Sequence, residues 1–354
     1  MRGTAAIIGG GIGGLAAARA LYDSGWEVTL HEREAGLSGA GTALGMWPSA
    51  LAALDRLGVG RAVRSRGTPQ EAATFLRPDG TAIARLDVGR MTRRAGDPVY
   101  LLSRPALLDL LLDAAPRLAL RFAEPVDDID SLRHKYDVVV AADGIYSGTR
   151  AQLFGTRYEA RYSGVTAWRG WLNDRPTTTM TETWGRGSKF GITPQEGGRT
   201  NWYATTVSPE RSFRPGHELA ALHELFASWH GPVRSVLPAI EEDTILRHDI
   251  HVVPRLSSYV RSNVALVGDA AHAMSPDLGR GACEALIDAV TLAACLVSAA
   301  TVADGLRAYD RRRRRPTQRV ASAAAFMSRL TRWTRGMWLR DAVLKLALHV
   351  PPPS

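Results

Sequence analysis

Residues 5–14 read AAIIGGGIGG, and this stretch decides the fold. The four apolar residues are typical of a central strand in a parallel sheet. The glycines after them fit the pattern Gly-x-Gly-x-x-Gly. Gly9 permits a tight turn, Gly11 lets the backbone approach a pyrophosphate, and Gly14 lets a helix pack closely on the strand. The stretch therefore predicts a nucleotide-binding turn between a strand and a helix.

The flanking segments complete a strand–helix–strand unit of about 30 residues, the size of a βαβ crossover. Residues 15–24 have helical spacing, and residues 27–31 read as a second strand that ends at Glu32. The start of the helix offers free N–H groups and a positive dipole end to phosphates. The Glu32 carboxylate would accept from ribose hydroxyls and repel a 2′-phosphate, so we expect FAD or NAD as the tightly bound nucleotide and not NADP.

Two later strands run into further motifs. Residues 137–142 lead into DGIYSGTR, residues 143–150, and residues 263–267 lead into GDAAH, residues 268–272. The second motif is followed by Pro276, Gly279, Gly281 and Asp288. Together with the first turn, these segments resemble the three fingerprints of the class A FAD-dependent monooxygenases, the p-hydroxybenzoate hydroxylase-type flavoprotein aromatic hydroxylases. Their order and distances match, and the resemblance spans residues 4–320.

The pattern of segments and the resemblance together predict an α/β fold built from two interleaved domains. A Rossmann-like FAD-binding domain with a parallel sheet is expected from residues 1–68, 98–158 and 255–305. Residues 69–97 and 159–254 hold more Thr, Trp, Tyr and turn residues, which predicts an inserted, mostly β substrate domain. Helices are expected at residues 48–57, 105–115 and 281–298, and C-terminal helices in residues 306–354.

The resemblance implies a tight, non-covalent FAD site with assigned roles. Arg104 would reach the pyrophosphate, Asp269 would accept from a ribityl hydroxyl, and Asp143 would shape the FAD site and the approach of NAD(P)H. Arg150 would tie that motif to the neighbouring backbone. The implied cofactor-binding residues are Gly9, Gly11, Ile12, Gly13, Gly14, Glu32, Arg33, Arg104, Val126, Asp143, Gly268, Asp269, Pro276, Gly279 and Gly281.

The sequence departs from many relatives at three places. Ser103 replaces a histidine, which weakens the expectation of a second pyrophosphate donor beside Arg104, and Ser49 replaces an asparagine. Cys283 replaces an asparagine expected close to the flavin. This cysteine is either a thiol near a redox centre or a small packed hydrophobe.

The activity that the resemblance implies is an FAD-dependent, NAD(P)H-consuming monooxygenase. NADPH or NADH would bind transiently, since no second glycine-rich unit is present, and O2 would form a flavin hydroperoxide. One oxygen atom would pass to an aromatic or otherwise electron-rich apolar small molecule, by hydroxylation or epoxidation, in specialised metabolism. The flavin does the chemistry, so no catalytic side chain is assigned. The alternatives are an FAD-dependent reductase or oxidase on the same scaffold and a non-enzymatic flavin sensor.

Aromatic residues of the insert are candidates for the substrate pocket: Trp168, Trp184, Phe190, Trp202 and Tyr203. They suit a large apolar or aromatic ligand. The alternative is that most of them form the core of the inserted domain. Arg169 is a further candidate, to orient or deprotonate a phenol.

Basic residues outnumber acidic ones by 44 to 35, and only three of the 44 are lysines. The arginine excess indicates either an anionic partner or compositional bias. Residues 311–315 form a run of five arginines, for which a solvated helix end or ion pairs between helices are favoured over nucleic-acid or membrane binding. Residues 322–348 read as apolar-striped helices that cap the pocket, pack on the β domain or form a dimer surface, so the chain is expected to be a monomer or homodimer.

Composition also limits where the protein acts. The apolar N-terminal run is too short for a signal peptide, and the Ala-rich stretch at residues 285–303 contains Asp288 and reads as a buried helix. Cys283 and Cys295, the only cysteines, would lie roughly 18 Å apart on it, too far to bond. The histidines show no metal spacing, so no metal site is expected. A cytoplasmic enzyme is predicted.

Overall fold

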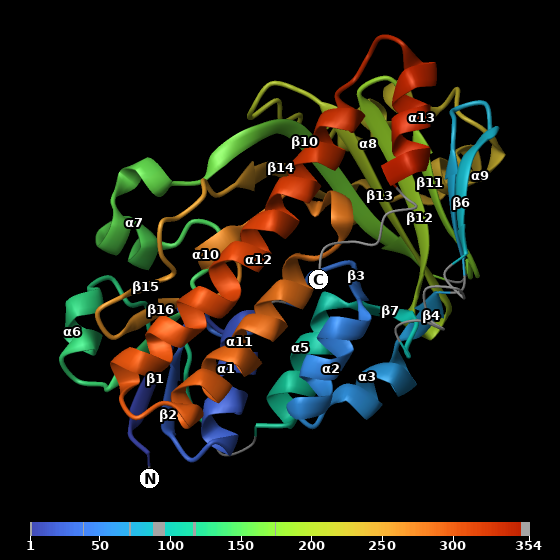
Figure 1. Cartoon of the computed structure of the whole chain (residues 1–354). Helices are drawn as coiled ribbons and strands as arrows, with labels where there is room; N and C mark the ends of the chain where they lie inside the picture. The colour runs from blue at the N-terminus through green and yellow to red at the C-terminus, as the bar shows by residue number, and fades with distance from the viewer. Residues whose placement is uncertain are drawn as a thin grey trace.

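The computed structural model describes residues 2–37, 39–70, 72–87, 96–115, 118–173 and 175–347. A parallel sheet and a larger, mostly antiparallel sheet lie side by side. The long helix α12 (Val302–Thr331) runs from the first toward the second (Figure 1). The predicted α/β class is confirmed.

The parallel sheet has six strands. Its central strand β1 (Thr4–Ile8) pairs in parallel with β2 (Glu27–His31) on one side and β9 (Val138–Ala141) on the other. The other members are β8 (Ala119–Arg121), β16 (Val264–Leu266) and the short antiparallel edge strand β15 (Val260–Arg261), in the order β15-β16-β9-β1-β2-β8. Each strand that precedes a motif is therefore in the same sheet, and the motifs meet at the carboxyl edge of its strands.

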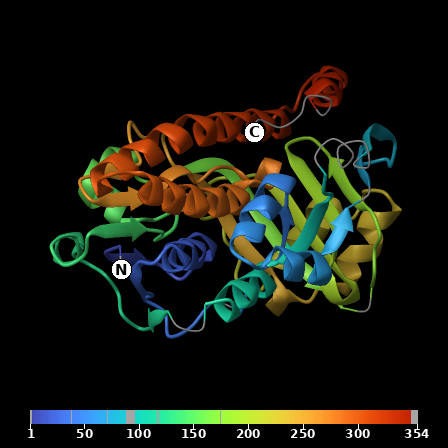
Figure 2. The ribbon, with the colours of Figure 1, turned by 60° about the horizontal axis from the view of Figure 1, so that its bottom comes forward.

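Helices cover this sheet where the sequence predicts them. α1 (Ile12–Asp23) packs against α11 (Gly281–Ser298), and α12 lies along α11 (Figure 2). The helices predicted at residues 48–57 and 105–115 are confirmed as α2 (Pro48–Arg56) and α5 (Arg104–Asp113). The shorter helices are α3 (Gly60–Arg66), α6 (Ile129–Arg133), α7 (Gly148–Phe154) and α10 (Asp269–His272).

Helix α11 is apolar and long enough to cross a membrane by length and composition, and it is the one such helix among the described residues. It packs between α1 and α12, and most of its side chains are buried. This is the position of a core helix. Cys283 and Cys295 lie on it, and both are buried free thiols.

The second sheet has seven strands in the order β14-β10-β13-β12-β11-β5-β6. Their bounds are β5 (Ala72–Leu76), β6 (Ala82–Asp87), β10 (Arg161–Leu172), β11 (Met180–Trp184), β12 (Ser188–Gln195), β13 (Arg199–Val207) and β14 (Leu246–Val252). All neighbours are antiparallel except β5 and β11. Helices α8 (Glu218–Phe226) and α9 (Gly231–Val236) pack on one of its faces. In the predicted segment 69–97, residues 71 and 88–95 lie outside the described residues.

Small elements connect the two layers. β3 (Ala43–Met46), β7 (Val99–Ser103) and β4 (Thr68–Gln70) form a three-stranded antiparallel sheet. The described connections contain short 3-10 helices: η1 (Thr156–Tyr158), η2 (Glu196–Gly198), η3 (Leu237–Ala239), η4 (Glu242–Thr244) and η5 (Pro276–Leu278).

The C-terminal residues are helical, as predicted. α13 (Met337–Ala347) follows α12, and its Leu344 is buried in one apolar cluster with Phe75 and Trp184 of the seven-stranded sheet. Of the three roles considered for these helices, packing on the β sheet is therefore confirmed. Residues 348–354 lie outside the described part of the chain.

Candidate functional site

The first turn has the geometry that its glycines predict. Gly9 has φ of +100°, which favours glycine, and a Cβ on Gly14 would lie 1.8 Å from the Gly9 carbonyl oxygen. No described atom comes within 4 Å of the position that a Gly11 Cβ would take. The strand and helix thus require glycine at 9 and 14, whereas Gly11 leaves open space in front of the first N–H groups of α1.

Glu32 stands at the end of β2 beside this turn. One oxygen of its carboxylate accepts from the Gly10 N–H at 2.6 Å, and the other accepts from the Glu34 N–H at 2.9 Å. The Arg33 side chain is exposed and pairs with Glu34 at 3.2 Å. Val126 and Ile12 are half-buried and pack against the main apolar core. Glu32 therefore lies next to the turn, as the strand–helix–strand unit predicts.

The second fingerprint is fixed by Arg150. This side chain is 1% exposed and donates to the carbonyl oxygens of Tyr158 at 2.9 Å, Ile145 at 2.6 Å and Ala270 at 3.0 Å. The predicted tie to the neighbouring backbone is confirmed, and it also reaches the third fingerprint. One Asp143 oxygen accepts from the Thr149 N–H at 3.0 Å, and the other is buried without a partner among the described residues.

The third fingerprint contains two left-handed glycines and a carboxylate. Gly268 and Gly279 both have φ of +59°, and a Gly281 Cβ would lie 4.0 Å from an Asp269 oxygen. Asp269 as a whole residue is exposed, yet the protein desolvates its carboxyl and raises the pKa of that group. The charges of His272, Arg104 and Arg150 lower the same pKa. The charge of Arg104, at the start of α5, therefore acts on Asp269, although the two residues are far apart in sequence.

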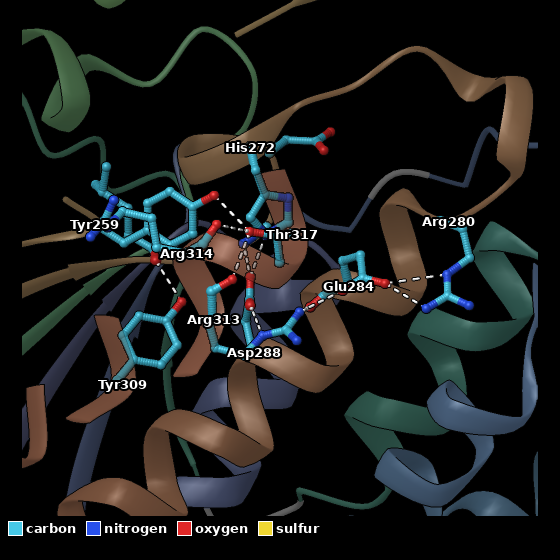
Figure 3. A network of polar contacts seen from close by, with 12 residues as sticks. Tyr259, His272, Arg280, Glu284, Asp288, Tyr309, Arg313, Arg314 and Thr317 are labelled. Atoms are coloured by element: carbon cyan, nitrogen blue, oxygen red, sulfur yellow. Dashed lines mark hydrogen bonds and ion pairs between the residues drawn. The ribbon is translucent and has the colours of Figure 1, made fainter. Parts of the chain in front are cut away.

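A buried ionic network lies behind this loop (Figure 3). Asp288 of α11 accepts from the Gly268 N–H at 2.9 Å and lies 2.6 Å from both His272 Nε2 and Arg313 Nε. Glu284 of the same helix binds Arg313 at 2.6 Å and Arg280 at 2.7 Å. Arg313 on α12 therefore neutralises two carboxylates of α11 directly beneath the loop.

Protonation equilibria reflect this network. Burial alone would lower the pKa of His272, but the charge of Asp288 and its hydrogen bond outweigh burial and raise it. Burial alone would raise the pKa of Asp288, and His272 and Arg313 together lower it. Of the five-arginine run, Arg313 alone is buried, and its contacts confirm the expected ion pairs between helices.

The aromatic pocket candidates divide between the two faces of the seven-stranded sheet, because side chains alternate along a strand. Trp168, Phe190 and Trp202 form an apolar cluster with residues of α8 and α9. This position corresponds to the alternative that they are core residues. Trp184 and Tyr203 lie on the opposite face, where both donate to Glu182. The structure therefore does not bring the five together.

Polar contacts join this sheet to the rest of the molecule near that opposite face. Lys189 Nζ lies 2.6 Å from an Asp277 oxygen in η5, between Pro276 and Gly279. Asn201 accepts from the Ala43 N–H of β3 at 3.2 Å, and the Ser103 N–H of β7 donates to Glu196 at 2.9 Å. The face that carries Tyr203 is thus the one that opposes the third fingerprint.

Two residues at this junction modify earlier expectations. Ser103, which replaces the histidine of many relatives, caps α5 by accepting from the Ala106 N–H. The Cys283 thiol donates to the Gly45 carbonyl, and burial raises its pKa to about 11, so it is a protonated, packed thiol at neutral pH.

Sequence reasoning missed the ion pair Lys189–Asp277. The rarity of lysine in this chain was the available signal. No cluster of three potential metal ligands occurs among the described residues.

Known proteins share this architecture. The chain matches the family described as FAD binding domain over residues 2–137 and 123–324. It is 31% identical to the aurachin C monooxygenase/isomerase of Stigmatella aurantiaca, over 97% of this chain and 94% of that protein. It is 29% identical to the FAD-dependent urate hydroxylase of Klebsiella pneumoniae, over 87% of this chain and 85% of that protein.

A solved structure of a similar protein has the same fold. The complex of Klebsiella pneumoniae HpxO with FAD and uric acid superposes with a TM-score of 0.88 at 27% identity, covering 98% of this chain and 93% of that one. The family match covers most of the chain and the relatives cover nearly all of it, in the fold described above. The chain therefore belongs to the FAD-binding domain family and is an FAD-dependent monooxygenase of the class A flavoprotein type.

Proposed function

We propose that this monooxygenase inserts one oxygen atom from O2 into an aromatic or otherwise electron-rich apolar small molecule, with NADH or NADPH as transient reductant. The observation that carries the proposal is the assembly of three FAD fingerprints at one sheet edge, opposite a polar face of the second sheet. The relatives named above include hydroxylases and monooxygenases, and another, 29% identical over 98% of this chain, is the zeaxanthin epoxidase of Prunus armeniaca. These names favour hydroxylation or epoxidation over the reductase or oxidase alternative.

The residues present fit FAD. Glu32 would hold the adenosine ribose, Arg104 the pyrophosphate, and Asp269 the ribityl chain. One buried Asp143 oxygen has no partner among the described residues, which supports a ligand there, since buried carboxylate oxygens are normally hydrogen-bonded. When bound, FAD supplies electron transfer from NAD(P)H and activation of O2.

The chain's own residues bind the cofactor, orient the substrate and exclude water. The N–H groups at residues 279–281 would stabilise negative charge beside the flavin ring. The two-domain organisation, with residues 69–97 and 159–254 as the substrate domain, encloses the substrate between the sheets. We further propose a cytoplasmic enzyme, monomeric or homodimeric, that acts in specialised metabolism.

Aerobic turnover in heavy oxygen tests the function. The purified protein is incubated with NADPH or NADH and with aromatic compounds that include urate and 3-amino-4-hydroxybenzoate. The masses of the products are then measured by mass spectrometry. Substrate-stimulated NAD(P)H oxidation with one heavy oxygen atom per product supports monooxygenation. Oxygen-independent turnover would instead support the reductase. A colourless protein whose nucleotide binding is unchanged by Glu32→Ala would contradict the FAD site.

A further inference from the structure

Helix α13 exposes apolar side chains and buries charged ones. Arg340 and Asp341 are 1% and 5% exposed, whereas Trp338 and Leu346 are 75% and 70% exposed. Leu339 is exposed as well. This is the reverse of the usual arrangement on a surface helix, whose apolar stripe faces the core and whose charges face water. The outward face of α13 is therefore apolar, and no described residue covers it.

The buried charges hold α13 in this orientation. Arg340 donates to the carbonyl oxygens of Trp184, at 3.2 Å, and of Gly185, and it binds Asp341 at 2.7 Å. Asp341 also binds Arg77 at 2.7 Å. A rotation of the helix that covered its outer face would break these contacts and leave the charges unpaired. The apolar face is thus a fixed outer surface of the molecule.

The end of α12 continues this surface. Met327 and Leu330 of α12 lie in the same apolar cluster as Leu344 of α13, so the exposed faces of both helices point away from one core. Figure 2 shows the two helices along the same side of the molecule. On this side Phe326 of α12 and Trp333, just after it, are also exposed.

Large apolar side chains gather here more than elsewhere. Of the nine that are exposed in the described part of the chain, five lie within residues 326–346: Phe326, Trp333, Trp338, Leu339 and Leu346. We call these five residues, together with the exposed Arg329 and Arg335 between them in sequence, the C-terminal surface. An exposed apolar gathering of this kind marks an interaction site.

The same segment is strongly basic. Residues 311–347 contain ten arginines and one lysine but a single acidic residue, the buried Asp341. Arg313, Arg314 and Arg340 have carboxylate partners. The exposed Arg329 has none among the described residues, and the same is true of Arg319 and Arg335. The segment therefore combines exposed aromatic and aliphatic side chains with an unbalanced positive charge.

This combination discriminates between partners. A second copy of the chain would place two surfaces of the same positive charge against each other, which is unfavourable. The phosphates of a nucleic acid would balance the charge but would leave the aliphatic side chains uncovered. An anionic lipid surface satisfies both features, because its headgroups balance arginines while Trp, Phe and Leu side chains enter the boundary between headgroups and acyl chains.

We propose that the C-terminal surface docks the enzyme on an anionic lipid bilayer. The end of α12 and the whole of α13 would lie in the plane of the interface. Trp338 and Leu346 would enter the headgroup boundary, and Arg329 and Arg335 would contact anionic headgroups. No helix crosses the bilayer in this arrangement. Charge alone favours a solvated surface for this region, and the fixed apolar face beside the charge adds the reason for docking.

Vesicle sedimentation with the full chain loaded with FAD tests the proposal. The probes are vesicles of phosphatidylcholine alone and vesicles of phosphatidylcholine mixed with phosphatidylglycerol. A basic residue near an anionic surface strengthens binding about fivefold, so we expect the mixed vesicles to bind the protein at least about tenfold more tightly than the neutral ones. Added salt should remove most of this difference, because it screens the charges.

Paired substitutions locate the charge effect. Arg329→Gln with Arg335→Gln should weaken binding to the mixed vesicles about tenfold or more. The matched control is Arg56→Gln with Arg61→Gln, which removes two exposed arginines at α2 and α3 and should leave binding nearly unchanged. FAD content and urea unfolding report the folding of each variant.

Tryptophan fluorescence reads the apolar contact directly. Lipids that carry bromine on their acyl chains quench a tryptophan that enters the headgroup boundary. We expect such quenching in the wild type, and we expect Trp333→Phe with Trp338→Phe to retain binding but lose the quenching. Trp338→Gln with Leu346→Gln should weaken binding itself at least about fivefold, because less apolar area leaves water.

Several results overturn the proposal. These are no binding to either kind of vesicle, equal binding to both, or equal effects of the two pairs of arginine substitutions. A stable dimer that dissociates in Trp338→Gln with Leu346→Gln would assign the surface to a second copy. Tighter binding of double-stranded DNA than of mixed vesicles would assign it to a nucleic acid. Binding that appears only in a chain cut after Ala347 would assign the surface to residues 348–354. None of these measurements depends on turnover, so their outcome is independent of the proposed monooxygenation.

Discussion

Arg313→Met is expected to destabilise the protein and to weaken FAD binding. Arg313 is 7% exposed, and its guanidinium lies 2.6 Å from both Asp288 and Glu284, which are 0% and 2% exposed. Removing one partner of a buried ion pair typically costs about 3–5 kcal/mol, because the other charge stays buried. His272 and Arg280 remain as counter-charges for the two carboxylates. We therefore expect the lower end, about 3 kcal/mol.

The assay compares urea unfolding and FAD titration of Arg313→Met with those of Arg311→Met. Arg311 belongs to the same arginine run and the same helix, but its side chain is exposed. Both variants lose one charge, so the difference between them isolates the buried ion pairs. Weaker FAD binding follows because Asp288 also holds the Gly268 N–H. Equal stability and equal FAD affinity of the two variants would refute the reasoning.

Further predictions address the turn, the network and the thiol. Gly14→Ala should lose about 1–3 kcal/mol, because its Cβ meets backbone at 1.8 Å, whereas Gly11→Ala should fold normally and lose FAD, as unfolding curves and flavin content would show. The folded-state pKa of His272 is raised, so its stabilising contribution is full below the ordinary value of 6.5 and is lost as the pH rises through the raised value. Wild type should therefore exceed His272→Gln in unfolding free energy by more at about pH 6 than at about pH 9; a constant gap would contradict this. With its pKa at about 11, Cys283 should resist iodoacetamide in the folded state and react only in denaturant, as mass spectrometry of the modified peptide would reveal.

Short-range sequence patterns predicted most of the candidate FAD-binding features. The turn at residues 9–14, the helix after it and Glu32 depend on neighbours within one strand–helix–strand unit, so sequence alone predicted their geometry. The same holds for the strands before the second and third fingerprints. Arg150 was predicted to bind nearby backbone, but its contact with Ala270, 120 residues away, depends on how the two fingerprints meet. Arg313 could be expected to form ion pairs, yet its partners became known only from the packing of α12 on α11.

The sequence by itself predicted the nucleotide-binding turn and the strands that carry the motifs, because these follow from short-range periodicity and motif spacing. The family was predicted from the resemblance of the three motifs to those of known flavoproteins. The tertiary structure decided which side of the second sheet faces the third fingerprint. Alternation requires Trp202 and Tyr203 to point in opposite directions, but it does not say which face α8 and α9 cover. That choice placed Trp202 in the core and aligned Tyr203 with Arg169 and Glu182 on the opposite face.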